Sequence, residues 1–314
     1  MNAATFAIIV ASATPLIFAA IGETITEKAG VVNLSLDGSM LLSAMTGFAI
    51  AYTTGSVELG LLAGMATSGL VAFVVAFGGI RLRVNQIAVG LILTYFATEL
   101  SALLGGAFVR KPGPSVQKMS LPVLEDIPFF GEILFQQNPL VYFSFVLVIA
   151  SFWWIFHTRR GLDLQAIGER PEAAFARGIP VNTLRYFYTV LGGALVGLGG
   201  AAFSLDAKMG WSEGHIANYG WIALAIVIFG GWHPLRVAFG CYLFGAIQIV
   251  ALKMQPTLPD LAQVLPIAPF PLMILTLVFL NMRVVQSFTM RFKGIGRLIR
   301  GTAPSALGES FWPD

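Results

Sequence analysis

The stretch that decides the fold is residues 86–108, which read QIAVGLILTYFATELSALLGGAF and contain one charged side chain, Glu99. A helix needs about 20 apolar residues, rising about 1.5 Å each, to cross the roughly 30 Å hydrocarbon core of a bilayer. The rest of the chain repeats this pattern. The other apolar runs are 3–21, 38–54, 59–79, 139–157, 186–205, 219–230, 235–252 and 266–282. The sequence therefore predicts an all-α fold, a polytopic transmembrane bundle of about nine spans in a single domain, 1–314. Because 219–230 is short, a re-entrant segment is the alternative there.

The composition of the whole chain agrees with a membrane protein. Of its 314 residues, 56% are hydrophobic and 11% are charged, whereas an ordinary soluble domain has about 25% charged residues. So few charged side chains cannot give a globule of this size a wettable surface, which argues against a soluble enzyme. The formal net charge of +3 is too small to suggest a nucleic-acid partner, and a single cysteine allows no intrachain disulfide.

Basic residues between the apolar runs set the expected orientation. They are concentrated in the connection 158–185 and in the tail after 282, and the short connection 80–85 holds two more. Loops rich in Lys and Arg stay on the cytoplasmic side of a membrane. Nine spans place all these segments on one side, so we expect the N-terminus outside and the C-terminus inside, in a bacterial inner membrane. In the cytoplasmic tail 283–314, the basic stretch 283–300 is expected either to lie on the anionic leaflet or to be simply solvated.

The cytoplasmic connection 158–185 contains the signals of a short helix. Pro171 suits a first helical turn, where its missing N–H is no loss, and Glu172 in that turn complements the helix dipole. Gly178, followed closely by a second proline, ends the helix. We therefore predict a helix of about eight residues, which is marginal alone in water and most useful if a partner docks on it.

Two groups of polar residues lie in or beside the apolar runs. The first is Asn33, Ser35 and Asp37, whose spacing of two puts them on one side of an extended segment. Irregular backbone at membrane depth is tolerated where protein or a water-filled cavity satisfies it, and transporters build their binding sites from such segments. These residues are predicted either to line a translocation path or to form a plain loop in which Asp37 caps the helix 38–54.

The second group lies on the run 86–108. Thr94 and Thr98 are one helical turn apart, Asn85 stands just before the run, and Glu99 lies about two-thirds along it. A carboxylate at that depth costs several kcal/mol unless it faces protein or water. This side of the span is predicted to line the path or to contact a second subunit. An interhelical or snorkelling pair is the alternative.

The sequence holds no recognisable catalytic motif. It has no G-x-x-x-x-G-K-[ST] phosphate loop and no G-x-S-x-G nucleophile elbow, and its three histidines are isolated from one another. The chain therefore has no visible means to hydrolyse a nucleotide or to perform covalent catalysis, and no metal site is suggested. If it moves a solute uphill, the energy must come from a partner or from an ion gradient. A membrane-embedded enzyme would need a cluster of His, Asp or Ser, and none converges in the sequence.

Several motifs resemble a known family of transport proteins. Residues 172–178, EAAFARG, are similar to the E-A-A-x-x-x-G signature of ABC importer permeases. Residues 22–38, 85–91, 192–201 and 220–234 resemble the ribose, nucleoside and branched-chain amino acid type of these permeases. They resemble in particular the purine-nucleoside type, which works with a basic membrane lipoprotein receptor. The stretch 192–201, rich in Gly and Ala, is also typical of a helix-packing face.

The resemblance implies a function and a set of partners. In that family the signature forms a coupling helix that sits in a groove of a cytoplasmic ATPase, which assigns this contact to Glu172, Ala173, Ala174 and Gly178. The ATPase would use ATP and Mg, and this chain would bind no cofactor. A second permease, expected to be a different chain, and an external substrate-binding lipoprotein would complete a transporter that works by alternating access. The expected solute is small and polar, in the first place a nucleoside. A simple sugar such as ribose, or an ion-coupled secondary transporter, is the alternative.

Overall fold

The computed structural model describes residues 2–120, 127–128, 131–257, 264, 267, 269–281 and 303–312. Most of these residues are helical. The helices are α1 (Ala3–Lys28), α2 (Leu36–Thr54), α3 (Val57–Ala76), α4 (Gln86–Gly105), α5 (Pro139–His157), α6 (Arg159–Glu169), α7 (Pro171–Ala176), α8 (Val181–Ala202), α9 (Tyr219–Phe229), α10 (Pro234–Met254) and α11 (Pro269–Asn281). Single-turn segments are η1 (Phe77–Arg81), η2 (Gly106–Phe108), η3 (Gly131–Phe135) and η4 (Phe203–Ala207), and the two-residue strands β1 (Met119–Ser120) and β2 (Gln136–Gln137) pair antiparallel. The prediction of a helical fold is confirmed.

Six helices of the described chain, some extended by the single turn that follows, are long and apolar enough to cross a membrane. They are Ala3–Lys28, Val57–Arg81, Gln86–Phe108, Pro139–His157, Val181–Ala207 and Pro234–Met254. The chain is therefore a multi-pass membrane protein. The predicted count of nine also needs α2, α9 and α11. Of these, α9 and α11 have 11 and 13 residues, or about 17 and 20 Å, so neither covers a hydrocarbon core by itself.

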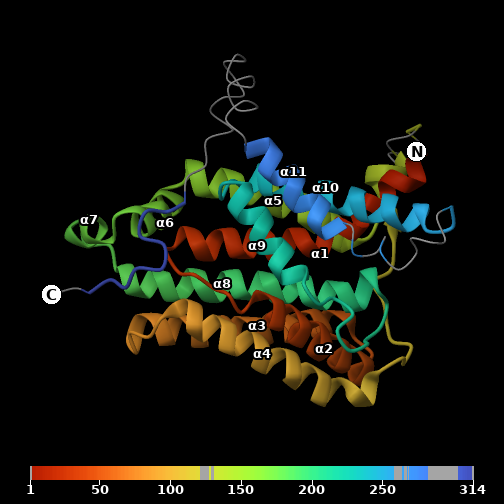
Figure 1. The fold of residues 1–314 in the computed structure, drawn as a ribbon, viewed down its shortest axis with the longest axis horizontal. Helices are drawn as coiled ribbons and strands as arrows, with labels where there is room; N and C mark the ends of the chain where they lie inside the picture. The colour runs from red at the N-terminus through yellow and green to blue at the C-terminus, as the bar shows by residue number, and fades with distance from the viewer. Residues whose placement is uncertain are drawn as a thin grey trace.

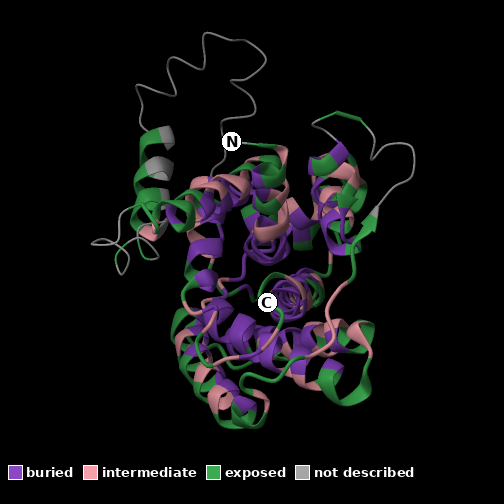
Figure 2. Ribbon diagram, turned by 90° about the vertical axis from the view of Figure 1, so that its right-hand side faces the viewer, coloured by how far each residue is buried: buried purple, intermediate pink, exposed green. Residues whose placement is uncertain are grey.

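α1 and α8 lie side by side in the middle of the bundle (Figure 1). α2, α3 and α4 lie on one side of this central pair, and α5, α10 and α11 lie on the other (Figure 1). Viewed from the end, the buried residues gather along the middle of the molecule (Figure 2). α7 and the N-terminus lie at opposite ends of the long axis (Figure 1), so the helices run between two separate faces.

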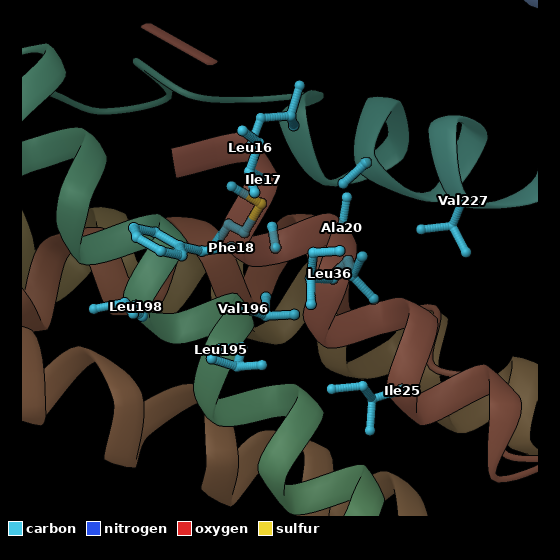
Figure 3. Packing of buried hydrophobic residues seen from close by; sticks show 14 of the residues in the cluster. Leu16, Ile17, Phe18, Ala20, Ile25, Leu36, Leu195, Val196, Leu198 and Val227 are labelled. Atoms are coloured by element: carbon cyan, nitrogen blue, oxygen red, sulfur yellow. The ribbon is translucent and has the colours of Figure 1, made fainter. Parts of the chain in front are cut away.

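Small residues on α8 allow the central helices to approach closely. A Cβ on Gly197 would meet the backbone of Gly64 on α3 and would lie 2.9 Å from Met65 Cα, closer than side chains tolerate. Larger side chains fill the remaining space, as Figure 3 shows for Leu195 and Val196 of α8 beside α1. The packing role predicted for 192–201 is confirmed, because such glycines bring membrane helices into contact.

The segment between α1 and α2 differs from its prediction. α1 continues to Lys28 and α2 begins at Leu36, so residues 33–37 do not form one extended strand. The alternative, in which Asp37 caps the following helix, is also wrong, because Asp37 lies in the first turn of α2 and Ser35 occupies the N-cap position. The prediction failed because residues 34–35 form a turn and α2 begins at Leu36, two residues before the apolar run that starts at 38.

α2 starts inside the bundle and not at its end. The Thr94 hydroxyl, about 12 Å into the 20-residue α4, donates to the Leu34 carbonyl just before α2 (2.6 Å). In turn, Asp37 in the first turn of α2 accepts the N–H of Gly220 in the first turn of α9 (3.0 Å). The N-terminal ends of α2 and α9 therefore meet about half-way along the bundle.

Candidate functional site

α7 is the helix predicted in the cytoplasmic connection, and local residues explain both of its ends. Pro171 occupies the first turn, as predicted. At the other end, the Ile179 N–H donates to the Ala174 carbonyl (3.1 Å) and the Gly178 N–H to the Phe175 carbonyl (2.8 Å), the paired bonds of a Schellman stop. Gly178 has φ +81°, which a side chain disfavours. The helix has 6 residues, fewer than predicted, because the stop takes up the residues that follow.

One face of α7 points outward. Ala174 is buried, whereas Glu172, Ala173 and Phe175 are exposed, with Phe175 at 45%. A helix as short as α7 is not stable alone. The rest of the chain must therefore hold its buried side. Three of the residues predicted to contact an ATPase, Gly178 included, therefore lie on the surface, and Ala174 anchors the helix from behind.

α6, which leads into α7, was not predicted from the sequence. Its N-cap is Thr158, whose hydroxyl accepts the N–H of Gly161 (3.1 Å). Two of its own side chains, Leu164 and Ile167, are fully buried. The sequence did contain a usable pattern, a threonine cap followed by apolar residues three apart.

A hollow of about 1160 Å³ lies between α6, α7 and the start of α8. Its walls carry more basic than acidic side chains, namely Arg159, Arg160, Arg170 and Arg177 against Asp163 and Glu169. The exposed ring of Phe187 on α8 adds an apolar edge. α7 is thus presented on a concave, positively charged surface at one end of the bundle.

Asn33 and Ser35, two of the residues predicted for a translocation path, bind each other. The Ser35 hydroxyl donates to Asn33 Oδ1 (2.6 Å), the Ser35 N–H reaches the same oxygen (3.2 Å), and Ser39 Oγ lies 3.1 Å from Ser35 Oγ. All three residues are buried. They satisfy the irregular backbone before α2 from within the protein, as membrane depth requires.

Asp37 and Thr94 tie α2 to two neighbouring helices. The Asp37 carboxylate sits at the N-terminal end of α9, where the helix dipole favours negative charge. Thr94 links α4 to the residue pair before α2 through its bond to the Leu34 carbonyl. The structure therefore brings together four of the seven residues predicted for the path, and it packs them as a buried lock between α2, α4 and α9. They line neither the hollow beside α7 nor a smaller cavity at the opposite end of the bundle.

The other three predicted path residues lie apart from this lock. Asn85 is the N-cap of α4, its side chain accepting the Ala88 N–H (3.2 Å). Thr98 is half-buried. Glu99 is exposed on the outward face of α4, one turn from Tyr95, which is 72% exposed. α4 therefore presents an apolar face with one carboxylate in it, which the rest of the described chain leaves uncovered.

Two buried carboxylates on α1 were not singled out as site residues from the sequence. Glu27 accepts the indole N–H of Trp232 at 2.5 Å. Glu23, one turn earlier, is completely buried, and within the described chain neither of its carboxylate oxygens has a hydrogen-bond partner. The available pattern was two acids four residues apart just after the apolar run 3–21, since ionisable residues within or beside a membrane span are rare and mark functional positions.

The opposite end of the bundle carries a second, smaller cavity of about 450 Å³ beside the first turns of α1. At its wall the Asn138 amide donates to Asp206 Oδ1 (2.8 Å). At the same end, His215 Nδ1 lies 2.7 Å from the Ser212 carbonyl. Burial lowers the pKa of His215 to about 4, with Lys208 adding to the shift and the Ser212 contact opposing it. His215 is therefore neutral at pH 7.

Relatives of this chain are transport subunits. The guanosine ABC transporter permease protein NupQ of Bacillus subtilis is 32% identical over 283 residues, which cover 84% of this chain and 88% of that protein. The nucleoside ABC transporter permease protein NupC of Lactococcus lactis is 32% identical over 262 residues, covering 79% and 83%. The putative glucose ABC transporter permease protein TsgC13 of Haloferax volcanii is 33% identical over 250 residues, covering 78% and 76%. No solved structure matches the chain.

The family model described as branched-chain amino acid transport system / permease component matches residues 5–277. That range includes the capped helix α7, the lock between α2, α4 and α9, and both central helices. The chain therefore belongs to this family and is the permease subunit of an ABC transporter, a transport protein whose ATPase is a separate subunit.

Proposed function

We propose that this chain forms part of an ATP-driven importer of nucleosides in a bacterial inner membrane. Its partners in the proposal are a cytoplasmic ATPase that uses ATP and Mg²⁺, a second and different permease, and an external substrate-binding lipoprotein. The names of two relatives, a guanosine and a nucleoside permease, support the nucleoside. Alternating access of a path between the two permeases would move the solute.

The observation that carries the proposal is the exposed, capped helix α7. It projects from the face where the arginines of the connection gather, with Ala174 buried behind it, and its outward residues include Glu172 and Phe175. A single short helix that is fixed behind and exposed in front suits insertion into a groove on a partner. We propose that this groove belongs to the ATPase and that closure of the ATPase pushes α7.

The proposed topology has nine passes, with the N-terminus outside and the C-terminus inside. α2 and α11 would cross together with their flanking residues, and α9 together with the turns at 216–218 and 230–233. Short helices are tolerated at membrane depth where protein satisfies the adjoining backbone, as the Asp37–Gly220 bond does for α9. The separation of the N-terminus from α7 and the C-terminus along the long axis supports an odd number of passes (Figure 1).

The outward face of α4 supports a second permease. An ionised carboxylate at the depth of Glu99 is costly against lipid and is tolerated against protein or water. We propose that the exposed Glu99 and Tyr95 face the path between the two permeases, with Thr98 at its border. The buried residues Asn33, Ser35, Asp37 and Thr94 would then shape the path from behind, by fixing where α2 begins.

A double substitution tests the proposed role of α7. Glu172→Lys with Gly178→Ala is expected to reduce ATP-dependent uptake of labelled guanosine to background while the permease stays in the membrane. Glu213→Lys with Gly214→Ala is the matched control, because it makes the same changes at an exposed acid and at a left-handed glycine (φ +64°) on the opposite face. The control should retain the ATPase on purification. Undiminished uptake by the α7 variant would rule out the coupling role.

A sugar is the second candidate solute, because two relatives from Haloferax volcanii are named as glucose permeases, one of them as putative. Competition between labelled and unlabelled solutes for uptake distinguishes the two candidates. If the solute is a nucleoside, excess unlabelled guanosine suppresses uptake of labelled nucleoside and excess ribose or glucose does not. If labelled sugar is taken up and excess guanosine does not reduce that uptake, the solute is a sugar and not a nucleoside.

A further inference from the structure

The C-terminal segment, residues 303–312, lies across the end of the bundle that carries α7. Figure 1 shows it in dark blue, running between the α6–α7 pair and α8. Its backbone bonds to two other segments: the Ala306 N–H donates to the Gly168 carbonyl of α6 (2.9 Å), and the Gly308 N–H donates to the Gly30 carbonyl after α1 (3.0 Å). These bonds join parts of the chain far apart in sequence.

Side chains attach the same segment at both of its ends. Ser305 donates to Glu169 Oε2 through its hydroxyl (2.7 Å) and its N–H (3.2 Å). At the other end, the Arg83 guanidinium lies over the Trp312 ring, 3.7 Å from its centroid, a favourable cation–π geometry. The segment is therefore held from the end of α6 to the turn before α4.

Phe311 links the segment directly to α7. Its ring centroid lies 5.5 Å from that of Phe175, at an interplanar angle of 56°, within the range of favourable aromatic pairs. Phe311 is 6% exposed, although Phe175 remains 45% exposed. The Phe311 ring is thus buried, whereas the Phe175 ring faces outward from α7.

A buried arginine fixes the segment from beneath. Arg185, in the second turn of α8, is 1% exposed. Its Nη1 donates to the Glu309 carbonyl (2.7 Å) and its Nη2 to the Ile167 carbonyl of α6 (3.2 Å). A planar guanidinium with several donors suits the joining of two backbones in this way. Gly30 has φ +86°, and a Cβ there would lie 2.8 Å from Arg185 Nη2, so the turn after α1 is shaped to this arginine.

We propose that residues 303–312 are a strap that holds α7 in position and carries its displacement to the turn between α1 and α2 and to the start of α4. The proposal rests on the function proposed above for α7. α7 is too short to be rigid alone, and the strap connects it to the segments whose positions determine where α2 and α4 begin. Phe311 and Arg185 are positioning residues in this scheme. Neither contacts the solute.

The test uses the complete importer, with its ATPase, second permease and receptor, reconstituted in proteoliposomes. The measured quantity is labelled guanosine imported per ATP hydrolysed. Phe311→Ala should lower this ratio about two- to tenfold, the factor that corresponds to one aromatic pair, and Phe311→Tyr should restore it. Phe239→Ala, which removes an exposed ring on α10, is the matched control and should leave the ratio at its wild-type value.

The outcomes separate the strap from the role of α7 itself. If Glu172→Lys with Gly178→Ala abolishes uptake while Phe311→Ala keeps the wild-type ratio, the strap is ruled out and the role of α7 stands. If the α7 variant keeps normal uptake, the proposed function fails first. A reduced ratio that Phe311→Tyr does not restore also counts against the strap.

A second variant keeps the strap testable if Phe311→Ala does not accumulate. Phe175→Cys with Phe311→Cys, in a Cys241→Ser background that removes the one native thiol, places two thiols at the contact. A short bifunctional thiol reagent should crosslink the two cysteines, since contacting rings leave the thiols farther apart than a disulfide spans. The crosslinked importer should keep its ratio, because strap and α7 move as one body. Failure to crosslink, or loss of transport on crosslinking, would overturn the proposal.

Discussion

Substitutions of Asp37 test whether this residue belongs to the buried lock between α2, α4 and α9 or contacts the solute. Its carboxylate accepts the Gly220 N–H at 3.0 Å and sits at the start of α9, so Asp37→Ala removes a charge-assisted hydrogen bond and leaves that N–H unsatisfied in the bundle. Such a loss destabilises a protein by about 2 kcal/mol. Asp37→Asn keeps an oxygen acceptor and loses only the charge at the helix end, about 0.5 kcal/mol.

These magnitudes convert into a thermal shift. For a chain of 314 residues, with an unfolding entropy of about 2.1 cal/mol/K per residue, 1 kcal/mol lowers the unfolding midpoint by about 1.5 °C. Asp37→Ala should therefore lower the midpoint by about 3 °C, and Asp37→Asn by about 1 °C. Two measurements are needed. The first is thermal unfolding of the purified permease in detergent, and the second is guanosine uptake by the importer, normalised to the amount of folded permease.

The uptake assay distinguishes the two roles of Asp37. If Asp37 is a lock, normalised uptake falls in the order of the thermal shifts, and the asparagine variant transports nearly as well as the wild type. If both variants keep the wild-type midpoint and both lose uptake, Asp37 contacts the solute and the lock is refuted.

Three further predictions concern packing and pH. Thr94→Val should lower the unfolding midpoint by a few degrees, because it leaves the buried Leu34 carbonyl without its donor at a cost of about 1–2 kcal/mol, whereas Thr94→Ser should not; equal shifts would show that the bond is unimportant. Gly197→Ala should destabilise by about 1–3 kcal/mol, since its Cβ would press into the backbone of Gly64, and an unchanged midpoint would contradict the close packing of α8 on α3. The pKa of His215 is lowered to about 4, so the unfolded chain takes up its proton first and stability should fall as pH drops from about 6.5 toward 4. His215→Gln should flatten this fall, and an identical pH profile in that variant would contradict the assignment.

Local patterns predicted those elements whose cause is local. The ends of α7 follow from Pro171 and Gly178, which act within one turn, and the apolar runs predicted most of the membrane helices. The packing of α8 also followed from its glycines, since small residues at such spacing have little other use in a membrane helix.

Long-range contacts account for what the sequence did not reveal. Nothing near Asp37 indicates that its partner is Gly220, so a residue that joins two helices was expected to line a path or cap its own helix. The docking of 303–312 depends in the same way on Arg185 and Arg83, which in the sequence look like ordinary cytoplasmic charges. The basic stretch 283–300 lies outside the described residues, and its interfacial position stays a prediction.

Hydrolysis of ATP by a partner subunit is proposed to drive this permease. The most direct test reconstitutes the complete importer in proteoliposomes with no ion gradient and measures guanosine uptake with ATP on the side that carries α7. Receptor-dependent uptake is expected with ATP, and none with a non-hydrolysable analogue. Uptake that proceeds without ATP when a proton or sodium gradient is imposed would show instead that an ion gradient drives the transport.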